Sequence, residues 1–134
     1  MAKYVYPAVF TKEDDGGYSI HFPDVDGCYT QGEDLQDGLT MANDALCLML
    51  YHLEEKQKPV PMPSDPLNIK VDDNAFISLV DCDTMEYRRF YDSKAVKKTL
   101  TIPAWLNTMA EQADVNFSQI LQTALKDQLH VSDR

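Results

Sequence analysis

The sequence predicts an α+β protein in two parts, an N-terminal sheet with one long helix and a small C-terminal strand–helix–helix unit. Three observations support this prediction. Apolar residues alternate in the segment 18–22, an apolar stripe with helical spacing runs from residue 35 to residue 53, and two further helical patterns follow Pro103. The predicted element order of the first part is β-β-β-α-β.

The first three strands are separated by two turns. Residues 3–12 form the predicted first strand, and the Asp-Asp-Gly-Gly run at 14–17 is a turn because Asp and Gly tolerate positive φ. In the second strand, 18–22, the side chains of residues 18, 20 and 22 share one face. A second turn covers 24–27, and a short third strand begins at 28–30. These segments predict a small antiparallel sheet.

A long helix follows, and its ends are marked by the sequence. Asp34 stands at the N-cap position, where its carboxylate can accept from the first-turn N–H groups. Lys56 and Lys58 suit the negative end of the helix dipole, and Pro59 stops the helix. One apolar stripe is predicted to pack on the sheet, and it consists of Leu35, Leu39, Ala42, Leu46, Met49 and Leu53.

After the helix, the first part continues with a proline-rich segment and then with residues typical of β-strands. The prolines in 60–66 predict an extended segment. We expect a short edge strand at 67–71 and a more central strand at 75–82, which is rich in apolar and β-branched residues. Residues 1–82 are then one domain. The segment 83–94, either a short helix or a mobile tether, is interpreted as the linker to a second domain at 95–134.

Charge is distributed unevenly between the two parts. Residues 1–92 carry seven Lys/Arg against eighteen Asp/Glu, a net charge of −11, whereas residues 93–134 carry five against four. Phosphate groups repel the acidic residues 1–92, so this part is not expected to bind nucleic acid. Its charge instead suits a basic protein partner. Only the charge of residues 93–134 is compatible with binding to nucleic acid.

Composition also limits the class of protein. A hydrophobic fraction of 44% argues against disorder of the whole chain, and no run of about eighteen apolar residues predicts a membrane span. The N-terminus lacks the apolar core of a signal peptide. Cys28, Cys47 and Cys82 are an odd number without a C-x-x-C pair, which favours reduced thiols in a core. We therefore expect a cytoplasmic location.

The C-terminal unit has the pattern of a strand and two helices. Lys97, Thr99 and Thr101 share one face of the predicted strand, with Leu100 and Ile102 on the other. The first helix opens at a proline, and the second is capped by an Asn with a Gln three residues later. About 35 residues in this arrangement cannot bury their apolar side chains as a monomer, so we expect a partner copy.

Several motifs of the first part resemble those of HicB antitoxins. They are GGY at 16–18, FPDVDGCYTQG at 22–32, the ALxxML-type helix and PMPS at 61–64. The resemblance implies a partial RNase H fold that serves as a binding module in a type II toxin–antitoxin system. It implies a HicA-type partner, an mRNA-cleaving toxin whose catalytic surface is occluded. The expected contact surface is the turn and strand at 24–32 with the exposed helix face, and its candidate residues are Asp24, Asp26, Tyr29 and Glu33.

The C-terminal unit resembles a ribbon-helix-helix domain. That family forms intertwined dimers whose paired strands read base edges in the DNA major groove. Carried over by position, Lys97, Thr99 and Thr101 would read bases, and Asn116 and Ser118 at the second helix N-terminus would meet a phosphate. The resemblance thus implies a homodimer or higher oligomer that represses its own operon at operator DNA.

The motif match is imperfect at two positions of this unit. Asp114 stands where the family often has glycine, and Phe117 stands where a basic residue is common. The second departure predicts weaker phosphate anchoring. A unit that only dimerises is the alternative to one that reads DNA.

Two other functions are compatible with the residues. The first is a stand-alone transcriptional repressor whose N-terminal domain senses a ligand or another protein. The second is a metal-dependent nuclease built on Asp24, Asp26, Asp81 and Asp83, although turn formation explains aspartates at these places equally well. The three histidines do not have the spacing of metal ligands, and the sequence has no glycine-rich loop that would bind phosphate. We therefore expect no enzyme activity, no bound metal and no cofactor.

Overall fold

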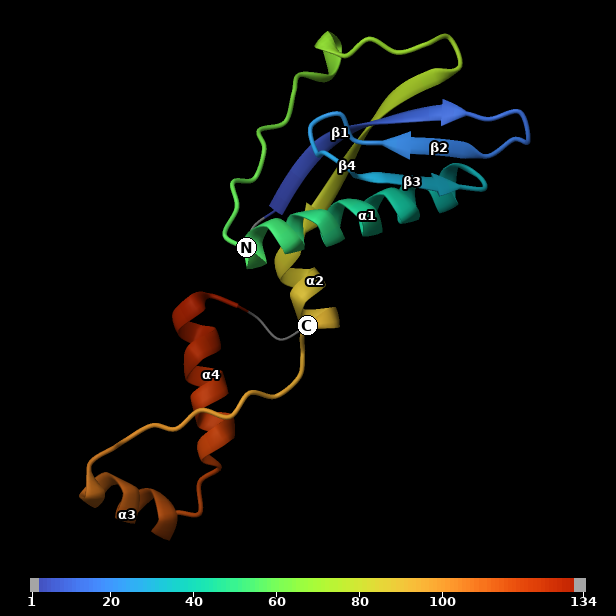
Figure 1. Ribbon diagram of the computed structural model, residues 1–134. Helices are drawn as coiled ribbons and strands as arrows, with labels where there is room; N and C mark the ends of the chain where they lie inside the picture. Colours follow the sequence, from blue (N-terminus) through green and yellow to red (C-terminus); the bar gives the residue numbers. More distant parts are fainter. Residues whose placement is uncertain (1–2, 132–134) are drawn as a thin grey trace. The chain divides into compact units, whose positions relative to one another are not determined.

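A computed structural model describes residues 3–131 of the protein (Figure 1). The chain divides into two compact units, with the boundary between Lys94 and Ala95. The first unit contains four strands, two α-helices and a 3-10 helix, and the second contains two α-helices. In chain order the elements are β1 (Lys3–Lys12), β2 (Tyr18–His21), β3 (Tyr29–Gly32), α1 (Leu35–Glu55), η1 (Pro66–Asn68), β4 (Ala75–Asp83), α2 (Thr84–Tyr91), α3 (Ala104–Gln112) and α4 (Phe117–Leu129).

The first unit is an antiparallel sheet with the strand order β3-β2-β1-β4. The β1–β4 ladder is long, running from Lys3 opposite Asp83 to Thr11 opposite Ala75. Helix α1 lies along one face of this sheet (Figure 1). The prediction of an α+β fold with the order β-β-β-α-β is confirmed.

Two predictions for the segment after α1 are wrong. Residues 67–71 form no strand, because Asp65 accepts a hydrogen bond from the N–H of Leu67 (N···O 2.9 Å) and starts the 3-10 turn η1. The strand predicted to be central, β4, is an edge strand that pairs only with β1 among the described residues. Its apolar composition is explained by α1, which buries Val80 and Cys82, whereas Leu79 is 59% exposed.

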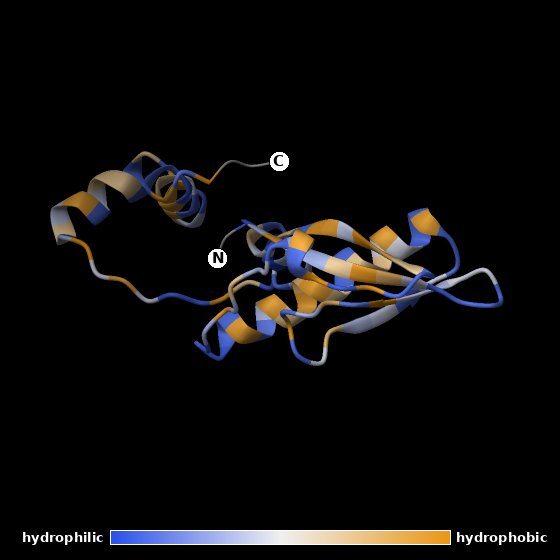
Figure 2. Ribbon diagram, turned by 90° about the horizontal axis from the view of Figure 1, so that it is seen from above, coloured by the Kyte–Doolittle hydropathy of each residue, from blue (hydrophilic) through white to orange (hydrophobic). Residues whose placement is uncertain are grey.

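The core lies between the sheet and α1. Figure 2 shows hydrophobic residues along the helix and the strands of this unit. The sheet contributes Tyr6, Phe10 and Ile20, and α1 contributes Leu46 and Leu50, each at most 2% exposed. Alternate residues of β1 and β2 thus point toward one helix face.

The predicted apolar stripe of α1 is wrong in its first turns. Leu35 and Leu39 are 54% and 47% exposed, whereas Gly38 is buried against the sheet. A Cβ atom on Gly38 would lie 3.1 Å from the Phe10 ring, so a larger residue here would require the ring to shift. The N-cap prediction is confirmed, because Asp34 Oδ1 accepts a hydrogen bond from the N–H of Asp37 at 2.8 Å.

Three helices end at a residue other than glycine in the left-handed conformation. Gln57 follows α1, Asp114 follows α3 and His130 caps α4, with φ values of 55°, 55° and 57°. After α1, the N–H of Lys58 donates to the carbonyl of Leu53 (2.9 Å), which satisfies a carbonyl of the last turn. Asp114 thus adopts the conformation for which glycine is favoured.

Within the segment expected to be a linker, residues 84–91 form helix α2. Hydrogen bonds and ion pairs join this helix to α1. Glu54 of α1 accepts hydrogen bonds from Tyr4 Oη (2.7 Å), Thr84 Oγ1 (3.0 Å) and Arg88 Nη2 (3.1 Å). Arg88 also pairs with Glu55. Asp83 caps α2 by accepting from the N–H of Met85 at 3.0 Å. These contacts make α2 part of the first unit.

The second unit consists of two helices without a buried residue between positions 95 and 131. Hydrophobic residues run along both helices (Figure 2), and the side chains of Trp105, Met109 and Leu129 are 66%, 59% and 67% exposed. Residues 97–102 form no strand in the single chain, because a β-ladder requires a second strand.

Candidate binding surfaces

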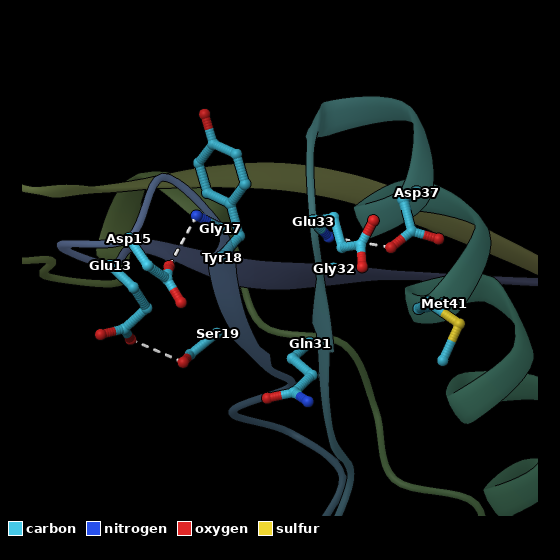
Figure 3. Close-up of a pocket in the computed structure, with 10 residues that line it drawn as sticks. All are labelled: Glu13, Asp15, Gly17, Tyr18, Ser19, Gln31, Gly32, Glu33, Asp37 and Met41. Atoms are coloured by element: carbon cyan, nitrogen blue, oxygen red, sulfur yellow. Dashed lines mark hydrogen bonds between the residues drawn. The ribbon is translucent and has the colours of Figure 1, made fainter.

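A hollow of about 630 Å³ lies where the β1–β2 hairpin meets the connection from β3 to α1. Glu13 and Asp15 border it from the hairpin, and Glu33 and Asp37 border it from the other side (Figure 3). None of the described residues that line it is Lys or Arg. Four carboxylates around one concave surface create a negative potential that suits a basic partner.

Close backbone contacts bring these segments together. A Cβ atom on Gly17 would lie 2.9 Å from the carbonyl oxygen of Gly32, and a Cβ atom on Gly32 would lie 2.5 Å from Cα of Gly38. Glycine at these three positions therefore lets the hairpin, β3 and α1 approach one another more closely than alanine would. The register Ser19 opposite Gln31 places the two sides of the hollow at the same end of the sheet.

Hydrogen bonds fix three of the four carboxylates. Glu13 accepts from Ser19 Oγ at 2.6 Å, and Asp15 accepts from the N–H of Gly17 at 2.9 Å. Asp37 accepts from the N–H of Glu33 at 2.8 Å (Figure 3). These bonds orient the charges before any partner arrives, which lowers the cost of ordering them on binding.

The four residues expected to contact a toxin fall into two groups. Asp24 and Asp26 lie in the β2–β3 turn, and Tyr29 begins β3, whereas Glu33 follows the opposite end of β3 in the acidic hollow. Asp24 is half-buried, and it accepts a hydrogen bond from the N–H of Ser64 (2.9 Å) and a second from its hydroxyl. Asp26 is exposed, so of the two turn aspartates it is the one available to a partner.

Tyr29 is the most exposed aromatic residue of the sheet. Its side chain is 73% exposed, and its ring lies 6.2 Å from that of His21 on the neighbouring strand. Because Ile20 points toward α1, His21 and Tyr29 lie on the opposite face of the sheet. An exposed tyrosine is a common anchor in protein interfaces.

Reasoning from the sequence missed three members of the hollow, Glu13, Asp15 and Asp37. Asp15 was assigned to the turn at 14–17, and no role was assigned to Glu13 or Asp37. The hairpin register was the signal that could have found them, because it places the turn beside the end of β3.

In the second unit, the five residues expected to bind DNA are exposed. Lys97, Thr99 and Thr101 alternate along the extended segment before α3. Asn116 caps α4 by accepting from the N–H of Gln119 at 3.0 Å, as its position predicts. Ser118 Oγ accepts from Gln122 Nε2 at 3.1 Å, so its hydroxyl already has one partner within the helix.

Two of the four aspartates considered for metal binding have local roles. Asp24 binds Ser64, and Asp83 caps α2. Within residues 3–131 no group of three or more His, Cys, Asp or Glu side chains lies close enough to hold a metal ion. The same residues contain no helix that is long and apolar enough to cross a membrane.

Comparison with known proteins assigns the chain to a family. A family model described as "HicB_like antitoxin of bacterial toxin-antitoxin system" matches residues 6–124. The chain belongs to this family of HicB-like antitoxins. The match extends over both units, so the C-terminal helices are part of the family pattern.

Individual relatives are similar over different lengths. Antitoxin HicB of Escherichia coli (strain K12) is 36% identical over 63 residues, which are 47% of this chain and 45% of that protein. The chain thus spans about half the length of this curated relative. An uncharacterized 14.9 kDa protein of Haemophilus phage HP1 is 27% identical over 106 residues, 76% of this chain and 75% of that protein.

Solved structures extend the similarity to the fold. A chain of a toxin–antitoxin complex from Streptococcus pneumoniae is 32% identical with a TM-score of 0.61, covering 94% of this chain and 99% of that one. A chain of a HicA3 and HicB3 toxin–antitoxin complex is 28% identical with a TM-score of 0.50, covering 60% of this chain and 99% of that one. This HicB-like chain therefore has the α+β fold of solved antitoxins.

Proposed function

We propose that this HicB-like protein is an antitoxin that binds a HicA-type mRNA-cleaving toxin and blocks its catalytic surface. The observation that carries this proposal is the family match over residues 6–124. Similar chains are found in solved toxin–antitoxin complexes, one of them with HicA3. The partner is thus a small basic protein, and inhibition is steric.

The first unit supplies the toxin-binding surface. The acidic hollow of Glu13, Asp15, Glu33 and Asp37 attracts a basic partner, and the exposed Tyr29 adds an apolar anchor at the other end of β3. Charge complementarity of this kind raises the association rate, while buried contacts set the lifetime of the complex. Because encounter is electrostatic, it weakens with added salt.

The second unit dimerises and binds operator DNA. Its apolar side chains are exposed in the single chain, and a second copy that pairs residues 97–102 as a two-stranded ribbon would cover them. Such a ribbon places Lys97, Thr99 and Thr101 of both copies on one surface. This arrangement gives the protein a second role as the repressor of its own operon.

Coexpression with the neighbouring gene tests the proposal. The tagged protein is purified from cells that contain its own operon, and partners are identified by mass spectrometry. We expect one small basic protein in stoichiometric amount, whose ribonuclease activity is inhibited in the complex. Recovery of a dimer without such a partner would contradict the antitoxin function and favour a stand-alone repressor.

A further inference from the structure

The outer edge of β4 directs the backbone groups of alternate residues away from the sheet. Among the described residues, β4 pairs with β1 on one side only (Figure 1). The N–H of Lys12 donates to the carbonyl of Asn74 (2.8 Å), so the alternation of an antiparallel ladder turns the even-numbered residues of β4 toward β1. The odd-numbered residues, from Ala75 to Asp83, therefore present their N–H and C=O groups to the outside.

Two of these outward groups, one near each end of the strand, have partners within the chain. The N–H of Ala75 donates to the carbonyl of Asp72 at 3.0 Å. The carbonyl of Asp81 accepts from Asn43 Nδ2 of α1 at 2.7 Å. Only the middle of the edge is then left for a strand outside this chain.

The middle of the edge consists of Ile77 and Leu79. Among the described residues, no group accepts from their N–H groups, and the carbonyl of Leu79 is approached only by the hydroxyl of Ser78 at 3.4 Å. Folded proteins usually protect such an edge with charged residues or proline, and residues 75–80 contain neither. An unprotected edge with unpaired amides indicates a site where another strand is added.

We propose that the edge of β4 pairs antiparallel with the same edge of a second copy, with Ile77 of each copy opposite Leu79 of the other. Each such pair exchanges two hydrogen bonds, so the open N–H and C=O groups of both residues are all used. Ala75 then lies opposite Asp81 of the other copy. The Ala75 N–H and the Asp81 carbonyl that would meet there are the two groups already bonded within their own chains. The pattern of open and closed groups is thus complementary to itself.

The side chains are complementary in the same register. On the α1 side of the sheet, Phe76 (40% exposed) lies opposite Val80 of the other copy, and Ser78 lies opposite its own equivalent. On the other side, Leu79 (59% exposed) lies beside Ile77 of the other copy. Apolar pairs of this kind across two strands stabilise the pairing.

Neighbouring registers are less favourable because of Asp81. Sliding one copy by two residues in one direction places Asp81 opposite the apolar Ile77. Sliding it in the other direction places Asp81 opposite Asp73, and like charges directly opposite each other are destabilising. The sequence of β4 therefore selects one register for a second copy.

The pairing joins two four-stranded sheets into one and keeps α1 of both copies on the same face. Leu39 precedes Asn43 by one helical turn, so it lies on the flank of α1 that reaches this edge, and it is 47% exposed in the single chain. The contact involves only the first unit. It is therefore distinct from the ribbon of residues 97–102, and a chain that uses both contacts assembles beyond a dimer.

Cross-linking of the full-length protein tests the register. In the proposed pairing the two copies of Ser78 form a pair without mutual hydrogen bonds, whose Cα atoms lie about 4.5 Å apart, within the range that a disulfide bridges. We expect Ser78→Cys to form a covalent dimer in oxidised glutathione, identified by mass spectrometry of the linked peptide. Leu79→Cys is the matched control, because its two copies lie diagonally, about 7–8 Å apart, and should remain unlinked. No cross-link in Ser78→Cys, or a cross-link in Leu79→Cys alone, would overturn the proposed register.

The mass of the assembly tests the contact itself. Leu79→Lys places a charge in the seam, and we expect it to halve the mass measured by light scattering over a range of protein concentrations. The halving is expected whether or not the C-terminal units also dimerise, so this test is independent of the proposed operator binding. Leu48→Lys, which alters an exposed leucine of α1 (43% exposed), should leave the mass unchanged. Equal masses of both variants and the unchanged protein would overturn the proposal, and loss of binding to the coexpressed toxin in Leu79→Lys would then assign the edge to a strand of that partner.

Discussion

Gly32 at the end of β3 and Gly38 in α1 are in backbone contact. A Cβ atom on Gly32 would lie 2.5 Å from both the Cα and the N of Gly38. No rotamer change relieves this overlap, because the neighbour is backbone. The contact fixes how closely α1 approaches the sheet, and it thereby shapes the acidic hollow beside it.

Gly32→Ala should destabilise the first unit by about 3 kcal/mol, at the upper end of overpacking costs. Gly38→Ala is the matched control, since its new Cβ would meet a Phe10 ring carbon at 3.1 Å, and a ring can shift. The helix propensity of alanine offsets part of that cost, by about 1 kcal/mol. Urea unfolding checks both variants. Equal stability of Gly32→Ala and the unchanged protein would refute this account of the contact.

Gln57→Gly should stabilise the first unit by about 1 kcal/mol. Gln57 has a φ of 55° at the end of α1, and a side chain in that conformation costs about 1–2 kcal/mol, which glycine avoids. Gln57→Ala serves as the control, because alanine has the same backbone restriction. Thermal and urea unfolding measure the difference between the two variants. The explanation fails if alanine stabilises as much as glycine.

The carboxylate of Glu54 should make stability depend on pH. Burial raises the pKa of this group, but hydrogen bonds from Tyr4, Arg88 and Thr84 outweigh burial and hold the folded-state pKa below its usual value. A lowered folded pKa stabilises the protein above the unfolded pKa of about 4.3. This stabilisation is lost as the pH falls through the folded pKa.

Glu54→Gln should remove that dependence. At pH 7 we expect the free energy of unfolding to fall by about 2 kcal/mol, because the hydrogen bonds to a charged carboxylate are replaced by weaker ones to a neutral amide. The variant and the unchanged protein should converge as the pH falls through the lowered folded-state pKa of Glu54, because the carboxyl is then protonated in the folded protein as well. Urea unfolding at several pH values measures both curves. Parallel curves across this range would show that the Glu54 cluster does not titrate on unfolding.

Charge reversal at the two ends of β3 should locate the toxin contact. Glu33→Lys should slow association with the coexpressed toxin about tenfold at low salt, because Glu33 shares a hollow with three other carboxylates. Asp26→Lys, the same change of charge at the other end of β3, should have a smaller effect. Stopped-flow binding at two salt concentrations measures both rates. A larger effect of Asp26→Lys would place the contact at the β2–β3 turn.

Lys97→Ala combined with Thr99→Ala should abolish specific operator binding and leave toxin inhibition unchanged. These side chains alternate on one face of the expected ribbon, where base edges are read. Lys98→Ala is the control, since it removes the same charge from the other face. Gel-shift titrations with operator and unrelated DNA compare the variants. Loss of toxin inhibition together with DNA binding would mean that the segment maintains the fold instead.

Local features of this protein were predictable because their causes lie within a few residues. The strand at Lys3–Lys12, the turn with Gly16 at φ 95° and the caps at Asp34 and Asn116 follow from alternation, turn chemistry and side-chain acceptors. The left-handed conformation at Asp114 agrees with its position at the end of the first helix, where the resemblance to ribbon-helix-helix domains implies glycine.

Features that depend on packing between distant residues required the tertiary structure. β4 has the composition of a central strand but lies at the edge, and Leu35 and Leu39 continue an apolar stripe but are exposed because Gly38 contacts the sheet. The same holds for the acidic hollow. By itself, the sequence determined the elements, their ends and the family resemblance, since these depend on local chemistry. Only the tertiary structure decided which side chains meet, because strand order and helix approach bring together residues far apart in the chain.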